Sequence, residues 1–191
     1  MTATFQPFGF RPTNDPSWRG RISNYQGAVA SAFATNIYEG TPLKMLADGT
    51  LDVVDDVSDK IFAIFSGVRY VDATGRAQIN NRWVGGTVAT EISFDLYAVN
   101  DAGCVFEVQA NGPVPLSAQY DQVNTVNPDA GSILFGRSTA AVNATTVGTG
   151  VQGQWRIVDF SRQPGNMAGD AYTIIKVQIA NSPVVAPVPA V

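Results

Sequence analysis

The chain has 191 residues and a formal net charge of −4; 45% of its residues are hydrophobic and only 15% are charged. This length fits one domain with a sizeable buried core. Because the sequence has no histidine and a single cysteine, Cys104, it excludes an internal disulfide, a zinc site of nitrogen and sulfur ligands, and a Ser-His-Asp or Cys-His nucleophile. We therefore expect a protein that is not an enzyme and binds no cofactor.

Charge and hydrophobicity also restrict the partners. The chain is weakly acidic, whereas general nucleic-acid binding needs a clustered positive surface. It contains no apolar stretch of about 18 residues, and its first residues lack the basic and apolar regions of a secretory signal. We expect a soluble protein, made in the cytoplasm, that contacts no membrane and no nucleic acid directly.

Residues 1–24 differ from the rest of the chain. They combine four large aromatic residues and three arginines with Pro7, Pro12 and Pro16, whose close spacing hinders pairing in a β-ladder. We predict an extended arm that lies away from its own core and orders on a neighbouring subunit. Solvated charges on a loose tail are the alternative interpretation of the arginines. The residues expected to bind the partner are Phe5, Phe8, Phe10, Arg11, Trp18, Arg19 and Arg21.

Residues 25–181 alternate between turn signals and strand-sized segments, which predicts one antiparallel β-sandwich or barrel domain with little helix. Asp48-Gly49 predicts a tight hairpin between residues 43–46 and 51–54. The turn at 72–75 similarly joins 61–71 to 77–83, and the turn at 100–103 joins 91–99 to 104–110.

Alternation of polar and apolar residues indicates which side of each strand is buried. In 91–99, the inward residues are expected to be Ile92, Phe94, Leu96 and Ala98, and in 104–110 they are Cys104, Phe106 and Val108. Two further strands are predicted at 155–160 and 171–180, separated by a polar loop. Residues 182–191 carry three prolines and no charge, which is typical of a polyproline-like tail.

Three motifs have simpler interpretations than the functions they suggest. Residues 148–153 match G-x-G-x-x-G, but no strand precedes them and no helix follows, so we interpret them as a turn. The aspartates of Asp52–Asp59 could offer oxygens to Ca²⁺, yet they lack the order of an EF-hand loop, which favours a solvated turn. Trp83 and Trp155 could form a sugar-stacking platform, but we expect them to be core or interface anchors.

A series of short motifs runs along the chain: Phe8-Gly-Phe10-Arg-Pro12, Asn36-Ile-Tyr38-Glu-Gly40, Ile64-Phe-Ser-Gly67-Val-Arg-Tyr70, Phe106-Glu-Val-Gln109 and Asn166-Met-Ala-Gly169-Asp170. Their order resembles that of the capsid cement or decoration proteins of tailed bacteriophages. The resemblance implies a β-rich protein on the capsid exterior of the virion that binds an HK97-fold lattice and braces it against DNA pressure. It implies two partners, the major capsid protein and neighbouring copies of the chain itself, and no catalytic residues.

Other functions remain open at this level. A surface-displayed carbohydrate-binding or adhesion module would need exposed coplanar tryptophans, and an enzyme would need a deep pocket with two paired carboxylates. A structural protein of the tail or of head completion would share the composition of a cement protein.

Overall fold

The computed structural model describes residues 4–13, 21–99, 101, 103–146, 148 and 152–184. These residues form β-strands joined by turns, with two single-turn 3-10 helices, η1 (Leu116–Ala118) and η2 (Ala144–Thr146). The strand pairs are antiparallel, and two isolated bridges are parallel. The predicted antiparallel all-β fold with little helix is confirmed.

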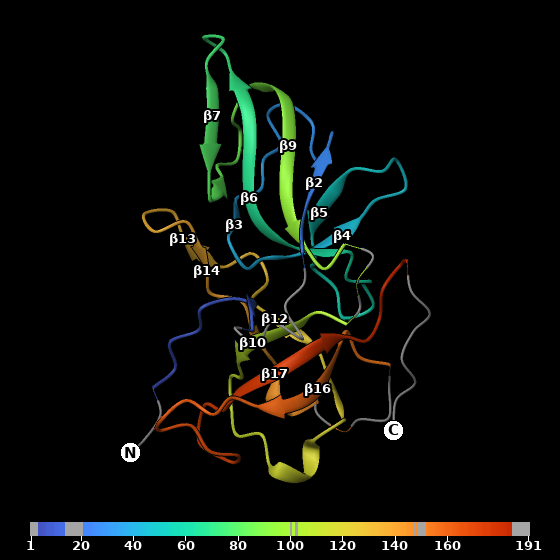
Figure 1. Cartoon of the computed structure of the whole chain (residues 1–191), viewed down its shortest axis with the longest axis vertical. Coiled ribbons are helices and arrows are strands. Elements are labelled where there is room, and N and C mark those ends of the chain that lie inside the picture. The colour runs from blue at the N-terminus through green and yellow to red at the C-terminus, as the bar shows by residue number, and fades with distance from the viewer. Residues whose placement is uncertain are drawn as a thin grey trace.

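Two large sheets stack along the longest axis of the molecule (Figure 1). The upper one, the β6 sheet, has the order β2-β9-β6-β4-β5, with β7 also paired to β6. Its strands are β2 (Ile22–Gln26), β4 (Pro42–Met45), β5 (Leu51–Val53), β6 (Ala63–Asp72), β7 (Ala77–Asn80) and β9 (Ala89–Tyr97). Both β4 and β7 lie along the edge of β6 that faces away from β9, so β2 and β7 are on opposite sides of this sheet.

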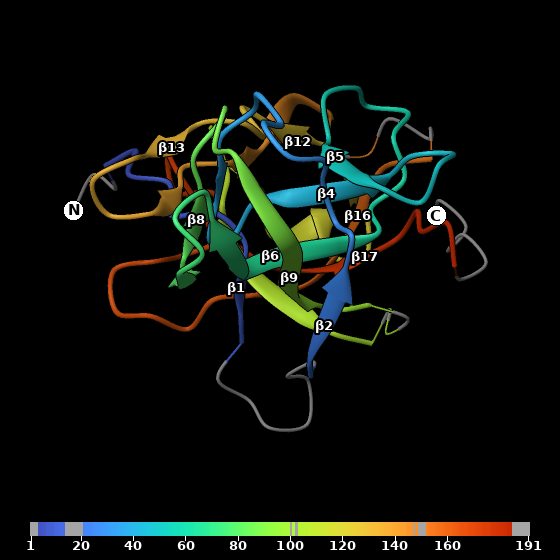
Figure 2. The same ribbon diagram turned by 90° about the horizontal axis from the view of Figure 1, so that it is seen from above.

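The lower one, the β17 sheet, has the order β1-β10-β17-β16-β11. Its strands are β1 (Arg11–Pro12), β10 (Val105–Gln109), β11 (Gln122–Val123), β16 (Trp155–Phe160) and β17 (Ile174–Ile179). Seen from above, strands of the β6 sheet lie over those of the β17 sheet (Figure 2). Three two-stranded pairs complete the described structure: β3 (Ile37–Tyr38) with β8 (Arg82–Trp83), β12 (Thr125–Val126) with β15 (Ala141–Val142), and β13 (Gly131–Ser132) with β14 (Arg137–Ser138).

Each large sheet has its own buried cluster. The cluster of the β6 sheet is centred on Phe65, Phe94 and Trp83, and the cluster of the β17 sheet on Phe106 and Trp155. Ile61, Ile64 and Ala98 come from the β6 sheet or its ends, yet they belong to the β17 cluster and thereby join the two halves. The predicted inward positions, from Ile92 to Ala98 and from Cys104 to Val108, are buried.

The hairpins predicted around Asp48-Gly49 and residues 72–75 form as β4–β5 and β6–β7, and β16 pairs with β17. The second arm of the β6–β7 hairpin ends at Asn80, however, and residues 82–83, predicted to continue it, form β8 and pair with β3. The predicted pairing of 91–99 with 104–110 is wrong. Ala98 adopts a left-handed conformation (φ 65°), and the bonds Asp101 N to Ala98 O and Cys104 N to Asp101 O turn the chain out of the β6 sheet. As a result, β9 pairs with β2 and β6, whereas β10 pairs with β1 and β17.

The expected boundary between arm and domain at residue 24 falls inside β2, whose residues Ile22–Gln26 pair along β9. Residues 22–24 are therefore part of the β6 sheet. At the other end, Ser182 is buried and Val184 is the last described residue; the rest of the expected tail lies outside the described residues.

Candidate partner-binding surface

The N-terminal segment 4–13 is attached to its own chain. β1 pairs with β10 at the edge of the β17 sheet, a position that tolerates proline. The side chain of Gln109 accepts a hydrogen bond from Gln6 N (2.8 Å) and donates one to Thr4 O (3.0 Å). The prediction that the whole arm avoids a β-ladder is therefore wrong for these residues.

Phe10 shows most clearly where the prediction fails. Its side chain is 1% exposed and stacks on Trp155 with ring centroids 4.2 Å apart and an interplanar angle of 16°. The preceding residue, Gly9, has a φ of 72°, and a Cβ there would lie 2.8 Å from Ser138 Cβ. This left-handed glycine lets the segment pass closely over β14 and turns Phe10 inward. Phe10 is a core residue and is not free to bind a partner.

Phe8 and Arg11 remain at the surface, where they contact each other. The guanidinium carbon of Arg11 lies 4.4 Å from the centroid of the Phe8 ring, a cation–π arrangement. Arg11 faces Glu107 in the β1–β10 register, but the Glu107 carboxylate accepts hydrogen bonds from Ser161 Oγ (3.0 Å) and Gln163 Nε2 (3.2 Å). Arg11 has no ion pair among the described residues, so its guanidinium is oriented by Phe8 and available to an outside acid.

Two adjoining pockets share Phe8 and Arg11. One, of about 270 Å³, lies toward Glu39, Tyr97 and Arg137. The other, of about 360 Å³, lies toward Gln109 and the loop 163–166. We call the two pockets with Phe8 and Arg11 between them the arm surface. It offers an aromatic ring, a cation and two recesses, a combination suited to a partner that presents an acidic and an apolar group side by side.

The other predicted partner-binding residues are dispersed. Phe5 is near the arm surface, where its ring packs 5.2 Å from that of Tyr172. Arg21 is exposed immediately before β2. Trp18 and Arg19 lie outside the described residues. The structure thus brings Phe5, Phe8 and Arg11 together.

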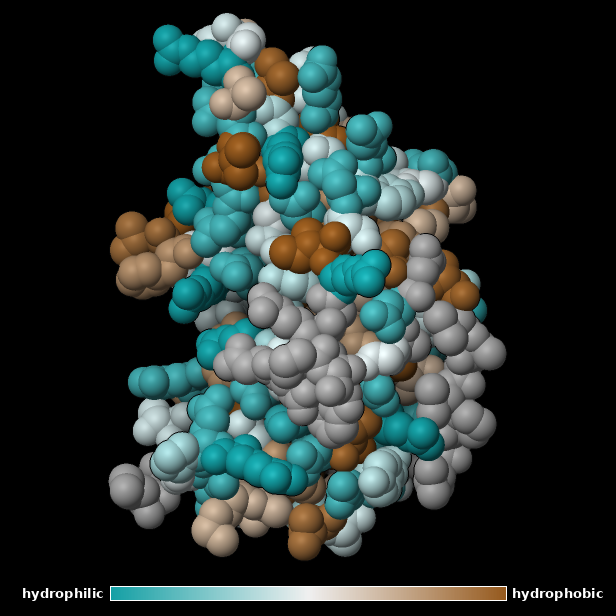
Figure 3. Space-filling view, in the orientation of Figure 1, coloured by the Kyte–Doolittle hydropathy of each residue, from teal (hydrophilic) through white to brown (hydrophobic). Residues whose placement is uncertain are grey.

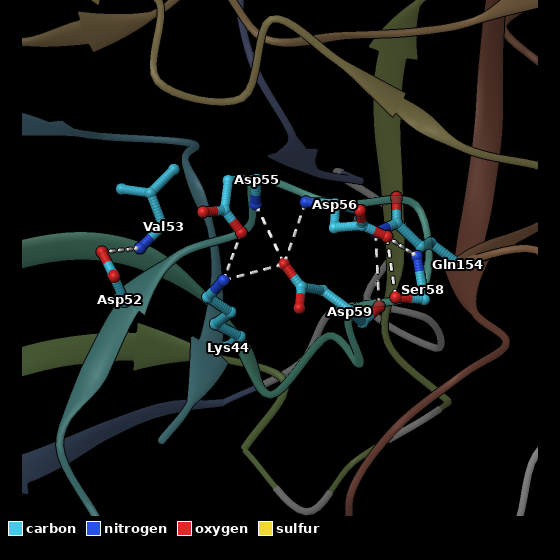
Figure 4. A network of polar contacts seen from close by, with 8 residues as sticks. All are labelled: Lys44, Asp52, Val53, Asp55, Asp56, Ser58, Asp59 and Gln154. Carbon is cyan, nitrogen blue, oxygen red and sulfur yellow. Dashed lines mark hydrogen bonds and ion pairs between the residues drawn. The ribbon is translucent and has the colours of Figure 1, made fainter.

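The aspartate-rich turn is organised around a lysine (Figure 4). Lys44 Nζ contacts the carboxylates of Asp55 and Asp59, and Asp59 Oδ2 also accepts hydrogen bonds from the amides of Asp55 and Asp56, both at 3.0 Å. Gln154 Nε2 donates to the carbonyl of Asp56 (2.9 Å), which ties the turn to the residue that directly precedes β16. Across the described ranges, no three His, Cys, Asp or Glu residues are grouped to hold a metal ion.

Protonation at this turn follows the same contacts. Burial raises the pKa of Asp59, but hydrogen bonds from the Asp55 amide and the Lys44 ammonium outweigh burial and lower that pKa below its ordinary value. For Lys44 the directions are reversed: burial lowers its pKa, but its hydrogen bonds to Asp55 and Asp59 have the larger effect, so the pKa of Lys44 lies above its ordinary value. The turn is an ion-paired structural element that fastens one half of the molecule to the other.

Trp83 and Trp155 are buried and hydrogen-bonded within the core. Trp83 Nε1 donates to Phe33 O (3.1 Å), and Trp155 Nε1 donates to Thr125 Oγ1 (2.9 Å). They form core anchors, and neither offers a face for stacking against a sugar. Cys104 is buried as well. In the segment 148–153, residues 149–151 lie outside the described part of the chain.

The sequence did not predict a second exposed surface, the apolar tip of the β13–β14 hairpin. The hairpin of β13 and β14 carries Ile133, Leu134 and Phe135 at its tip, exposed by 52%, 78% and 69%. It projects from one side of the molecule in Figure 1, and a brown protrusion is visible at the same level in Figure 3. The available signal was three consecutive apolar residues between Gly131 and Gly136, within a polar stretch.

Comparisons with protein-family models, with curated proteins and with solved structures found no match to this chain. Within the described residues, no helix is long and apolar enough to cross a membrane.

Proposed function

We propose that the protein is a structural protein of a virion, a cement or decoration protein that binds the outside of an HK97-fold capsid lattice and stabilises it against internal DNA pressure. The observation that carries the proposal is the arm surface, where Arg11 is oriented by Phe8 and has no ion pair within the described ranges. The order of sequence motifs, which resembles that of phage cement proteins, supports the same conclusion.

The chemistry of this surface suits attachment to another protein. A guanidinium engages a carboxylate through two parallel hydrogen bonds, and the flat Phe8 ring beside it contributes apolar area. Each copy would have to bury on the order of 1,000 Å² in total to bind specifically. Many copies on a symmetric lattice would then add their separate contributions to the stability of the particle.

The proposal is tested on particles assembled with and without the protein. Particles without it should release DNA at a lower temperature, and adding the purified chain back should restore the parental temperature. The double variant Phe8→Ala/Arg11→Glu should bind these particles at least about tenfold more weakly, because it removes an anchor and reverses a charge at a contact.

The matched control is Arg76→Glu, which reverses an exposed arginine in the turn between β6 and β7, away from the arm surface. It should bind and stabilise particles like the parent. Unchanged thermal DNA release after clean removal of the protein would overturn the cement function. Equal binding by the double variant and the control would show that the arm surface does not face the lattice.

A further inference from the structure

The tip of the β13–β14 hairpin is apolar and well anchored. Asn81 Nδ2 donates to Phe135 O (3.1 Å), and Glu39 N donates to Gly136 O (2.9 Å). At the base, a Cβ on Gly131 would lie 2.2 Å from the ring of buried Tyr38, so the hairpin rests directly on that ring. An exposed apolar group on a rigid support binds with little loss of conformational freedom, which is the property of an interface anchor.

A groove of about 840 Å³ lies at the opposite side of the β6 sheet, between the end of β2 and the start of β9. Its lining includes the buried apolar residues Val29, Ala89 and Ile92, together with residues 26–27. Its volume is within the range of pockets that enclose drug-sized ligands. We call it the β2–β9 groove.

Glu91 gives the groove its charge. It is exposed, lines the groove, and has no ion pair within the part of the chain that the structure describes. The backbone φ of Glu91 is 52°, which is unusual for a residue other than glycine. Glu91 lies where the pairing of β9 with β6 is irregular, opposite the β6 segment between Arg69 and Val71. At the base of the hairpin, Arg137 is also exposed and without an ion pair among the described residues, so hairpin and groove carry opposite charges.

Hairpin and groove cannot meet within one chain. The hairpin is bonded to Asn81, directly after β7, whereas the groove lies at β2 and β9. β7 and β9 pair with opposite edges of β6, so the body of the sheet separates the two features. A contact between them requires two molecules.

We propose that Ile133, Leu134 and Phe135 of one copy insert into the β2–β9 groove of a second copy, with Arg137 facing Glu91 at the rim. The contact joins two different surfaces, so the copy that inserts its hairpin keeps a free groove and the copy that receives it keeps a free hairpin. Such a heterologous contact continues into a closed ring or an open array of copies. The proposal stands independently of the capsid function.

The first test measures self-association of the full chain by sedimentation equilibrium. The parent should form oligomers in a concentration-dependent manner, and Leu134→Ser/Phe135→Ser should weaken association at least about tenfold. The groove variant Thr90→Arg/Glu91→Lys should weaken it similarly, because it fills the groove and opposes Arg137. Met167→Ser is the matched control, since Met167 is 73% exposed in a distant loop, and it should associate like the parent.

A mixing experiment then separates this contact from a symmetric one. The hairpin variant keeps an intact groove and the groove variant keeps an intact hairpin, so an equal mixture should form a heterodimer that grows no further. Circular dichroism of each variant verifies that both are folded. A parent chain that stays monomeric at about millimolar concentration, or two folded variants that do not combine on mixing, would overturn the proposal.

The variants also keep the two proposals apart. The groove variant makes the distinction, because the β2–β9 groove shares no lining residue with the arm surface, whereas Phe8 lines a pocket together with Phe135 and Arg137 of the hairpin. Thr90→Arg/Glu91→Lys should lose self-association even where no capsid is present, and its single copies should still bind particles. Self-association kept by the groove variant would contradict the assignment of the contact to hairpin and groove.

Discussion

Replacing Phe10 with alanine tests whether the N-terminal segment belongs to the core of its own chain. The ring is 1% exposed and stacked on Trp155, which also contacts Phe106 in an edge arrangement with centroids 6.1 Å apart. Truncating a buried phenylalanine leaves a cavity and costs about 3–5 kcal/mol. Since about 1 kcal/mol corresponds to roughly 2–4 °C in a domain of this size, we expect Tm to fall by roughly 10 °C.

The assay is unfolding in urea, followed by the fluorescence of the buried tryptophans. Phe8→Ala is the control, because Phe8 is only partly buried and lines the arm surface; its loss should cost less than about 1 kcal/mol. The midpoint of Phe10→Ala should fall with little change in the slope, as expected when stability alone changes. Equal midpoints for the two variants would refute the placement of Phe10 in the core.

Two further predictions concern turns. Hydrogen bonds from the Thr74 hydroxyl, the Arg76 amide and Gln78 lower the pKa of Asp72 from its ordinary value of 3.8 to about 2. The stability that ionised Asp72 contributes is therefore fully present above pH 3.8 and is lost as the pH falls toward 2. Asp72→Asn should therefore flatten the fall of Tm between pH 4 and 2, and an NMR titration that places this pKa near 3.8 would contradict the reasoning. Gly131→Ala should displace the β13–β14 hairpin, because its Cβ would collide with the Tyr38 ring; unchanged amide shifts of residues 131–138 would count against that contact.

Local turn chemistry made several elements predictable from the sequence. Asp48-Gly49 and the turn at 72–75 join strands that are neighbours along the chain, so a left-handed glycine at Gly49 or Gly75 is enough to define each hairpin. The inward residues of β9 and β10 followed from alternation alone.

Pairing between distant segments was not predictable in the same way. The strand signal at 104–110 was correct, but its partners are distant in the sequence and leave no local mark: Arg11 of β1 pairs 96 residues away with Glu107, and Gln178 of β17 pairs 73 residues away with Val105. The arm was misjudged for a related reason: proline spacing argues against a central strand but is compatible with two residues at a sheet edge. The acidic turn was predicted to be solvated, but Asp55 and Asp59 are paired with Lys44, and this lysine comes from β4, outside the turn itself.

The positions of the three contact features have a consequence for how copies would assemble. The arm surface lies at the edge of the β17 sheet and adjoins the β13–β14 hairpin, since Phe8 lines a pocket with Phe135 and Arg137, while the β2–β9 groove lies on the opposite side of the β6 sheet. If the two proposals hold, one copy binds the lattice through its lower half and two neighbours through its upper half. Arm variants would then reduce the affinity of every copy equally, whereas groove variants would reduce only the cooperativity between copies. Binding curves of both variants on the same particles would separate these effects, because the first shifts the midpoint and the second lowers the steepness.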